Sequence, residues 1–196
     1  PLSGHAHRAE PCLSLLRLPF ERIEIDMPGG EHKSPEFLRR NPLGQVPVIE
    51  DGETTLADSN AILVYLATRY DASGRWYPAD PLLRGRVQQW LSIAAGQLAA
   101  GPCVARLVKV FGMKLDYENA RSIAARLFVH LDDHLSRHEF FVGRSPSLAD
   151  VALYSYTAHA PEGGVPLAPY PNVREWLTRM EILDGFVPMA RSPIPD

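Results

Sequence analysis

Two places in the sequence combine a hydroxyl side chain with an expected helix start, where proteins commonly bind anions. Ser59 follows Asp58 and opens a run with helical spacing, and Ser3 precedes another helix-like run. The first N–H groups of a helix have no partner within it, so a nearby carboxylate or thiolate is stabilised. His32 and Lys33 are adjacent cationic or polar donors in a loop, which suit a carboxylate. Each of these residues also has a plainer interpretation, as a helix cap or as solvated surface.

A proline interrupts an apparent strand in the stretch GQVPVIEDGETTLADSN. Val46, Val48 and Ile49 favour a strand, yet Pro47 has no N–H to give to a ladder, and proline is confined to edges, strand starts or bulges. The Asp51-Gly52 pair then favours a tight hairpin turn before the returning strand. Hydrophobic periodicity alone does not explain why a ladder should end at this proline.

Histidines recur in two patterns that could suggest a metal. His130, His134 and His138 share one helix face, and paired histidines at this spacing bind zinc in some enzymes. No further ligand motif accompanies them, so a solvated polar face is the favoured interpretation. His5 and His7 form an HxH near Ser3, where a place at the mouth of a site is favoured over a metal role. We therefore expect no metal.

Composition excludes several classes of protein. The chain has 196 residues, of which 45% are hydrophobic and 22% charged, as in ordinary globular proteins. A net charge of -3 gives no basic field for nucleic acid or an anionic membrane, and we expect no apolar run long enough to span one. Cys12 and Cys103 form no CxxC pair, which favours a reduced, cytoplasmic setting, and Cys12 is expected in the core.

The first part of the chain mixes helix and strand patterns. We expect a helix over 5–18, a strand over 20–26, and a short helical turn over 34–38 with Ser34 as its cap, followed by the hairpin and the helix after Ser59. A half-buried sheet of this kind needs one more strand. We expect that strand before Ser3, outside the sequence given.

The second part has helical periodicity throughout. Residues 71–81 are rich in Gly, Ser and Pro and are interpreted as a linker, which gives an α/β domain over 1–70 and an all-α domain over 82–196. A long helical pattern weakens at Gly96 and at Gly101-Pro102, where a kink is expected. Further helices are expected after Asp116, after the capping-box motif Ser147–Asp150, and over 171–180.

Two stretches resemble the cytosolic glutathione S-transferases, with a thioredoxin-like first domain and an all-helical second domain. They are EHKSPEFLRRNPLGQVPVIEDGETTLADSNAILVYLATRY over 31–70 and SLADVALYSY over 147–156. Ser3, after the place of the first strand, is similar to the catalytic serine of bacterial or plant phi-like enzymes. The resemblance implies a homodimer and glutathione as co-substrate, with no metal.

The resemblance also implies an answer to the question of the proline. In this fold the peptide bond before Pro47 is cis and the backbone of Val46 turns out of the sheet, where it is free to pair with a peptide ligand as an added strand would. Gln45 and the Val46 backbone would then bind the main chain of glutathione.

Each charged part of glutathione has a counterpart by this resemblance. His32 and Lys33 would hold the glycine carboxylate. Ser59 would hold the γ-glutamyl carboxylate and Asp58 the γ-glutamyl amine. Ser3 would stabilise the thiolate by a hydrogen bond, aided by the helix that follows.

The second substrate is expected between the two domains. Candidate lining residues, on the family's variable long helix, are Ala100, Cys103, Val104, Arg106 and Leu107. Tyr154 and Tyr156 are interpreted as packing, and Arg8 as an ion-pair partner. The sequence thus favours an enzyme that joins glutathione to apolar electrophiles or uses it to reduce peroxides. The alternative is a non-catalytic binding or interaction module of the same fold.

Overall fold

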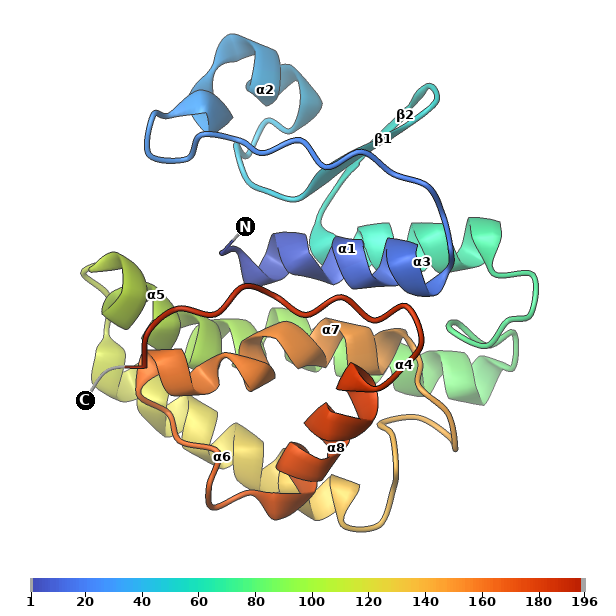
Figure 1. The fold of residues 1–196 in the computed structure, drawn as a ribbon, viewed down its shortest axis with the longest axis vertical. Helices are drawn as coiled ribbons and strands as arrows, with labels where there is room; N and C mark the ends of the chain where they lie inside the picture. Colours follow the sequence, from blue (N-terminus) through green and yellow to red (C-terminus); the bar gives the residue numbers. More distant parts are fainter. Residues whose placement is uncertain (1, 195–196) are drawn as a thin grey trace.

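The computed structural model describes residues 2–194 and shows two layers of unequal size. A small part with helices and a β-hairpin lies over a larger bundle of helices (Figure 1). The expected class, α/β followed by all-α, is confirmed. One continuous apolar core joins the two parts, because Ile62 and Leu63 from the small part belong to the same buried cluster as Trp90 and Leu91 from the bundle.

Helices α1 (Gly4–Leu15) and α3 (Ser59–Tyr70) pack against each other and rest on the bundle. Pro11 lies inside α1, and Cys12 is buried in the core, as expected. Burial raises the pKa of the Cys12 thiol to about 12, so the thiol is protonated at neutral pH and acts as a small hydrophobic group.

The sheet consists of one antiparallel hairpin. Strands β1 (Val48–Asp51) and β2 (Thr54–Ala57) pair so that Val48 lies opposite Ala57 and Asp51 lies opposite Thr54. The two-residue turn is therefore Gly52-Glu53, one position later than the expected Asp51-Gly52 pair, with Gly52 at a φ of 60°. The strand expected over 20–26 is wrong: this segment runs as irregular chain, with Ile23 70% exposed. A strand forms only with a hydrogen-bonded neighbour, and in residues 2–194 the only ladder joins β1 to β2.

A short helical region precedes the hairpin. It contains the 3-10 turn η1 (Glu31–Lys33) and helix α2 (Pro35–Arg40). The Ser34 hydroxyl accepts a hydrogen bond from the Phe37 amide at 3.1 Å, so the expected cap is confirmed.

The long helix of the bundle is bent where the sequence suggested. Helix α4 (Pro81–Ala95) ends at Gly96, a π-helical turn η2 (Ala99–Cys103) contains Pro102, and α5 (Val104–Phe111) continues beyond it. Taken as one helix, 81–111 is long and apolar enough to cross a membrane by length and composition alone, contrary to the sequence-based expectation. Its buried side packs against α7 and α6, as in the core helix of a bundle.

The remaining helices complete the bundle. They are α6 (Tyr117–Leu135), α7 (Leu148–Ala158), the 3-10 turn η3 (Ala160–Gly163) and α8 (Pro171–Glu181). Asp116 caps α6, and Ser147 with Asp150 forms the expected capping box of α7. Helix α7 lies at the centre and is buried along almost its whole length (Figure 1).

The chain after α8 runs back across the bundle as an extended tail, beside α7 and towards α5 (Figure 1). One anchor of this tail is His7 of α1. Its Nε2 donates to the Val187 carbonyl at 2.8 Å, and its Nδ1 lies 2.9 Å from the Ser155 hydroxyl. Because a backbone carbonyl only accepts, the Ser155 hydroxyl is the donor to Nδ1 in the neutral ring.

Stability is expected to fall as the pH is lowered below about 6.5, partly because of His7. Burial lowers the pKa of His7 from 6.5 to about 4. The unfolded state therefore takes up a proton first, so the contribution of His7 is complete above pH 6.5 and declines by about 1.4 kcal/mol per pH unit down to about pH 4. Urea unfolding of the wild type and of His7→Gln at pH 7.5 and pH 5 checks this.

The His7→Gln variant should lose less stability between the two pH values than the wild type does. A residual dependence is expected in the variant, because burial also lowers the pKa of His5 to about 4. Identical pH dependence in the two proteins would contradict the assignment to His7.

Candidate functional site

The hairpin register brings the proline turn next to the start of α3. Val48 pairs with Ala57, so the segment that contains Val46 enters the hairpin at the same end at which the chain leaves it towards Ser59. The Val46–Pro47 peptide bond is cis. Within residues 2–194, neither the amide nor the carbonyl of Val46 has a hydrogen-bond partner. A half-buried backbone with free groups is thus placed at a helix N-terminus.

Asp58, and not Ser59, caps α3. One oxygen of its carboxylate accepts from the Asn60 amide at 3.0 Å and from the Ala61 amide at 2.9 Å. The backbone of Asp58 has a φ of 73°, a left-handed conformation that is costly for a residue other than glycine. The cap leaves the Ser59 amide without a hydrogen-bond partner in the described chain.

Helix α1 contributes two side chains to the same place. The Arg8 guanidinium donates to the Ser59 hydroxyl at 3.0 Å and to His5 Nδ1 at 3.2 Å. The interpretation of Arg8 as an ion-pair partner is wrong: no carboxylate in residues 2–194 lies within ion-pair distance of it. Burial lowers the pKa of His5 to about 4, so its ring is neutral at pH 7.

Ser3 occupies the cap position of α1. Its hydroxyl oxygen accepts from the Ala6 amide at 3.2 Å, which confirms the plainer of its two interpretations. Accepting leaves the hydroxyl proton free, so the cap and a hydrogen bond to an anion are compatible. The residue before it, Leu2, is held through its carbonyl by Arg106 at 2.7 Å.

The loop of His32 and Lys33 lies beside the segment that leads into Val46. Lys33 Nζ donates to the Leu43 carbonyl at 3.2 Å, and Asn41 fixes the Gln45 carbonyl at 2.8 Å. Gly44 between them has a φ of 60°, and a Cβ there would lie 2.7 Å from both the His32 carbonyl and Lys33 Nζ. Only glycine fits this turn, which brings the two polar stretches together.

The five residues expected around a second substrate separate into different environments. Val104 and Leu107 are half-buried on α5, and Cys103 is buried, where burial raises the pKa of its thiol. Ala100 faces elsewhere and lines a groove between α4 and α6. Arg106 does not line a pocket, because its side chain is only 2% exposed and is engaged in a buried ion pair.

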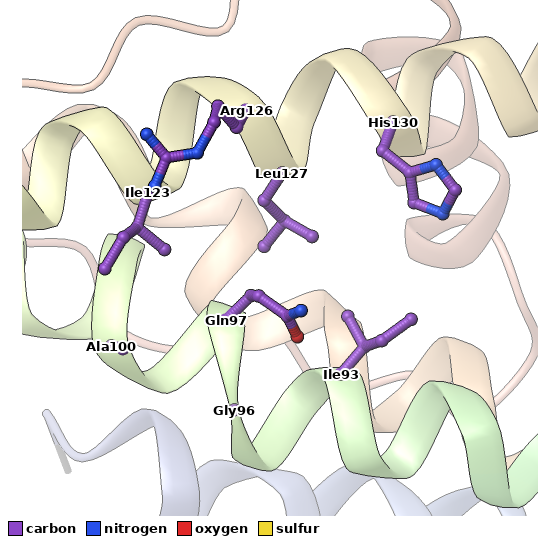
Figure 2. A pocket seen from close by; sticks show the side chains of 8 residues that line it. All are labelled: Ile93, Gly96, Gln97, Ala100, Ile123, Arg126, Leu127 and His130. Atoms are coloured by element: carbon purple, nitrogen blue, oxygen red, sulfur yellow. The ribbon is translucent and has the colours of Figure 1, made fainter.

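That groove is a hollow on the surface of the bundle (Figure 2). Figure 2 shows side chains from α4 and η2 facing side chains from α6 across it. Its volume is about 650 Å³, and it is lined by Ile93, Gly96, Gln97, Ala100, Ile123, Arg126, Leu127 and His130. None of these belongs to the hairpin or to α1 and α3, so the groove is separate from the site at Ser59.

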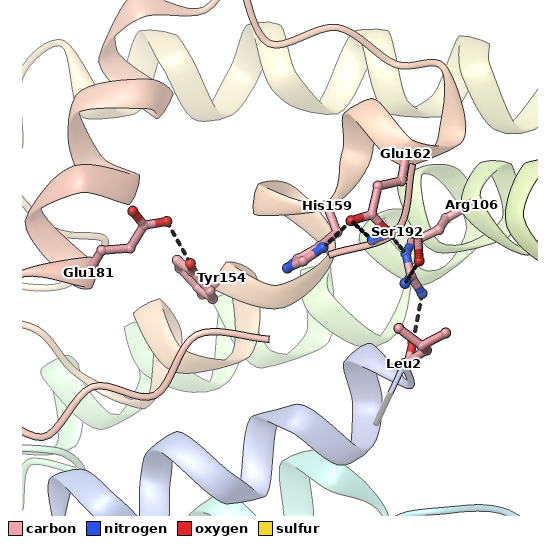
Figure 3. Close-up of polar contacts among 7 residues, drawn as sticks. All are labelled: Leu2, Arg106, Tyr154, His159, Glu162, Glu181 and Ser192. Atoms are coloured by element: carbon pink, nitrogen blue, oxygen red, sulfur yellow. Dashed lines mark hydrogen bonds and ion pairs between the residues drawn. The ribbon is translucent and has the colours of Figure 1, made fainter. Parts of the chain in front are cut away.

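Arg106 belongs to a buried polar cluster that joins distant parts of the chain (Figure 3). It pairs with Glu162 at 2.6 Å, and Glu162 also accepts from His159 at 2.6 Å and from the Ser192 amide at 2.9 Å. Burial alone would raise the pKa of Glu162, but hydrogen bonds from Arg106 and His159 outweigh burial and lower it. The cluster thus ties the tail to α5 and to the carbonyl just before Ser3.

Two of the recurrent histidines, His130 and His134, lie on α6, and His138 follows the end of this helix. His130 stacks on Trp90, His134 meets the edge of Trp90, and His138 stacks on His134. His130 and His138 are exposed, as the favoured interpretation of a solvated face expects, and His134 is half-buried. In the part of the chain that the structure describes, no group of three acidic, His or Cys side chains could hold a metal ion.

Comparison with known proteins gives a consistent result over the chain. The family model for the glutathione S-transferase N-terminal domain matches residues 2–69, and that for the glutathione S-transferase C-terminal domain matches residues 115–179. Glutathione S-transferase theta-1 of Mus musculus is 32% identical over 90% of this chain and 80% of its own length. Glutathione S-transferase 3 of Zea mays is 29% identical over 100% of this chain and 93% of its own length.

Solved structures show the same likeness. The glutathione S-transferase from Pseudomonas fluorescens Pf-5 superposes with a TM-score of 0.87 and 34% identity, over 95% of this chain and 94% of that one. A glutathione transferase homologue from Drosophila mojavensis was solved with bound glutathione. It superposes with a TM-score of 0.83 at 25% identity, over 93% of this chain and 84% of that one.

Proposed function

The chain belongs to the glutathione S-transferase family, and from that premise we propose that it binds glutathione at Val46 and Ser59 and activates the thiol with Ser3. The protein is a glutathione transferase with the fold of that family. The proposed glutathione site rests on one observation. A backbone with unpaired amide and carbonyl groups at Val46 lies at the end of the hairpin from which the chain enters α3, and α1 is linked to the start of α3 through Arg8 and Ser59.

The proposed site matches the parts of the tripeptide one by one. The main chain of glutathione pairs with Val46 and Gln45 as an added strand. The γ-glutamyl carboxylate accepts hydrogen bonds from the hydroxyl and the amide of Ser59, and the γ-glutamyl amine donates to the Asp58 carboxylate. His32 and Lys33 hold the glycine carboxylate, which is supported by their place beside the Gly44 turn.

The proposed chemistry is stabilisation of the thiolate. A free thiol has a pKa of about 8.5, and a decrease of about two units requires about 2.7 kcal/mol of preferential thiolate binding. The Ser3 hydroxyl supplies one charge-assisted hydrogen bond, and the N-terminus of α1 supplies favourable dipoles. We propose on this basis a serine-type enzyme with phi-like use of Ser3.

The thiolate then attacks an electrophilic carbon of a small apolar molecule. The half-buried side chains Val104 and Leu107 support an apolar second site, and peroxide reduction is a further proposed use of the same thiolate. A steady-state assay with glutathione and either an aromatic halide or an organic hydroperoxide tests this. Turnover with one of them is expected. Glutathione binding without turnover of either would favour the alternative, a non-catalytic binding module.

We also propose a homodimer in the cytoplasm, in which the first domain of one subunit packs on the helical domain of the other. An apolar groove between α4 and α6 and exposed side chains such as Val129 and Leu82, 62% and 63% accessible, support a covered face on the bundle. Size-exclusion chromatography with light scattering is expected to give twice the chain mass of 21.8 kDa, and a monomer would contradict it.

A further inference from the structure

Arg8 is a buried cation with no anion beside it. The side chain is 1% exposed, and in residues 2–194 no carboxylate lies within ion-pair distance. Its other hydrogen bonds in the described chain go to the Asn60 side-chain oxygen at 3.4 Å and the Ala94 carbonyl at 3.5 Å, and its guanidinium lies 5.8 Å from the centre of the Tyr156 ring. Its Nε has no hydrogen-bond partner. A charge held in a dry site is unfavourable unless opposite charge compensates it.

The surroundings of Arg8 compensate its charge only weakly. The start of α3, where Ser59 and Asn60 lie, carries the positive end of a helix dipole. Asp58, which precedes Ser59, attracts the guanidinium, but its carboxylate oxygen already accepts from two amides of α3. Burial accordingly lowers the pKa of Arg8, and the attraction of Tyr156, Cys103 and Asp58 opposes that shift.

We propose that Arg8 is the internal counter-charge for the γ-glutamyl carboxylate of glutathione and acts on it through the Ser59 hydroxyl. This inference rests on the function proposed above and assigns Arg8 as a positioning residue. Arg8 donates to the Ser59 oxygen, and the Ser59 hydroxyl proton has His5 Nδ1 as a long acceptor at 3.4 Å, which a ligand carboxylate would replace as the stronger acceptor. The Ser59 amide is unpaired in the described chain. One carboxylate can accept hydrogen bonds from both the hydroxyl and the amide of Ser59, while the Arg8 guanidinium contacts the Ser59 oxygen.

Two features favour the γ-glutamyl carboxylate over the thiolate as the anion that Arg8 stabilises. The guanidinium contacts Ser59 and Asn60 of α3, while the hydroxyl of Ser3 contacts Ala6 and has no contact with Arg8. A hydrogen bond from a cation also polarises the hydroxyl that receives it, which strengthens the next hydrogen bond in the chain. Arg8 therefore affects how tightly glutathione binds, and Ser3 affects the reactivity of the thiol.

The test compares two ligands in each variant by titration calorimetry. One ligand is glutathione, and the other is 4-aminobutyryl-cysteinylglycine, which lacks only the γ-glutamyl carboxylate. Arg8→Met is expected to weaken glutathione binding about 10- to 100-fold and to change the affinity for the analogue less than about 3-fold. Arg8→Lys should lose less, because the charge remains. Arg17→Met, at an exposed arginine, is the matched control and should bind both ligands as the wild type does.

Two further measurements separate this role from a structural one. Arg8→Met should raise the KM for glutathione while kcat at saturation and the pKa of the bound thiol are retained. Without ligand it should unfold no more easily than the wild type, since a buried uncompensated charge has been removed.

The inference is overturned if Arg8→Met weakens both ligands equally, shifts the thiol pKa at unchanged affinity, or fails to fold. If the wild type binds neither ligand, the proposed function itself fails. If the wild type binds glutathione and Arg8→Met behaves as the wild type does, only the role of Arg8 fails.

Discussion

Replacement of Ser3 by alanine is expected to lower kcat/KM for glutathione conjugation about 10- to 100-fold near pH 6.5. The physical reason is loss of the hydroxyl hydrogen bond to the thiolate, which should raise the pKa of bound glutathione by about one to two units. At a pH below both values the thiolate fraction falls by the same factor. A pH–rate profile, together with the ultraviolet absorbance of the bound thiolate, measures both quantities.

Ser3 also caps α1, so the alanine variant needs a control that keeps the cap. Ser3→Asp supplies one: its carboxylate accepts from the Ala6 amide as the hydroxyl does, but it donates nothing and repels a thiolate. Stability should then be similar for Ser and Asp and about 1 kcal/mol lower for Ala. Activity should fall in a different order, with Asp below Ala. If the two orders agree, Ser3 acts only as a cap.

Replacement of Asp150 by alanine is expected to destabilise the folded protein by about 3 to 5 kcal/mol. The side chain is 0% exposed and accepts four hydrogen bonds, from the Phe141 amide, the Ser147 amide, the Ser147 hydroxyl and Trp176 Nε1. All of these donors are buried, so alanine would leave them without partners at the centre of the bundle. Thermal unfolding should show a decrease of the midpoint by roughly 6 to 20 °C.

Asp133→Ala is the matched control for this effect. Its carboxylate pairs with Arg137 one helical turn away, and both side chains are exposed. Such pairs contribute little, so a change below about 0.5 kcal/mol is expected. Equal loss of stability in the two variants would show that the buried hydrogen bonds of Asp150 stabilise the folded protein no more than an exposed ion pair does.

The elements with strong local signals were predictable from sequence. The Ser34 and Asp116 caps, the capping box and the helix interruptions at Gly96 and Gly101-Pro102 lie where the sequence predicted them. The hairpin turn was predicted to within one residue, since it lies at Gly52-Glu53 and not at Asp51-Gly52. Each depends on residues a few positions apart, whose side chains act on the neighbouring backbone. The roles of Ser3, Val46 and Ser59 towards glutathione remain predictions.

The features that sequence reasoning missed depend on distant partners. Residues 20–26 alternate like a strand but have no ladder to join. Arg106 seemed a pocket residue, yet its partner Glu162 lies 56 positions away on η3. Arg8 seemed an ion-pair residue. A signal was present for it, because it lies four positions before the buried Cys12 and hence on the buried side of α1.

A crystal structure of the protein with glutathione tests the central claim most directly. The account predicts hydrogen bonds of about 3 Å from the tripeptide main chain to the amide and carbonyl of Val46, with the γ-glutamyl carboxylate on Ser59 and the sulfur beside the Ser3 hydroxyl. Glutathione bound in the α4–α6 groove, or bound anywhere that leaves the Val46 backbone unpaired, would contradict it.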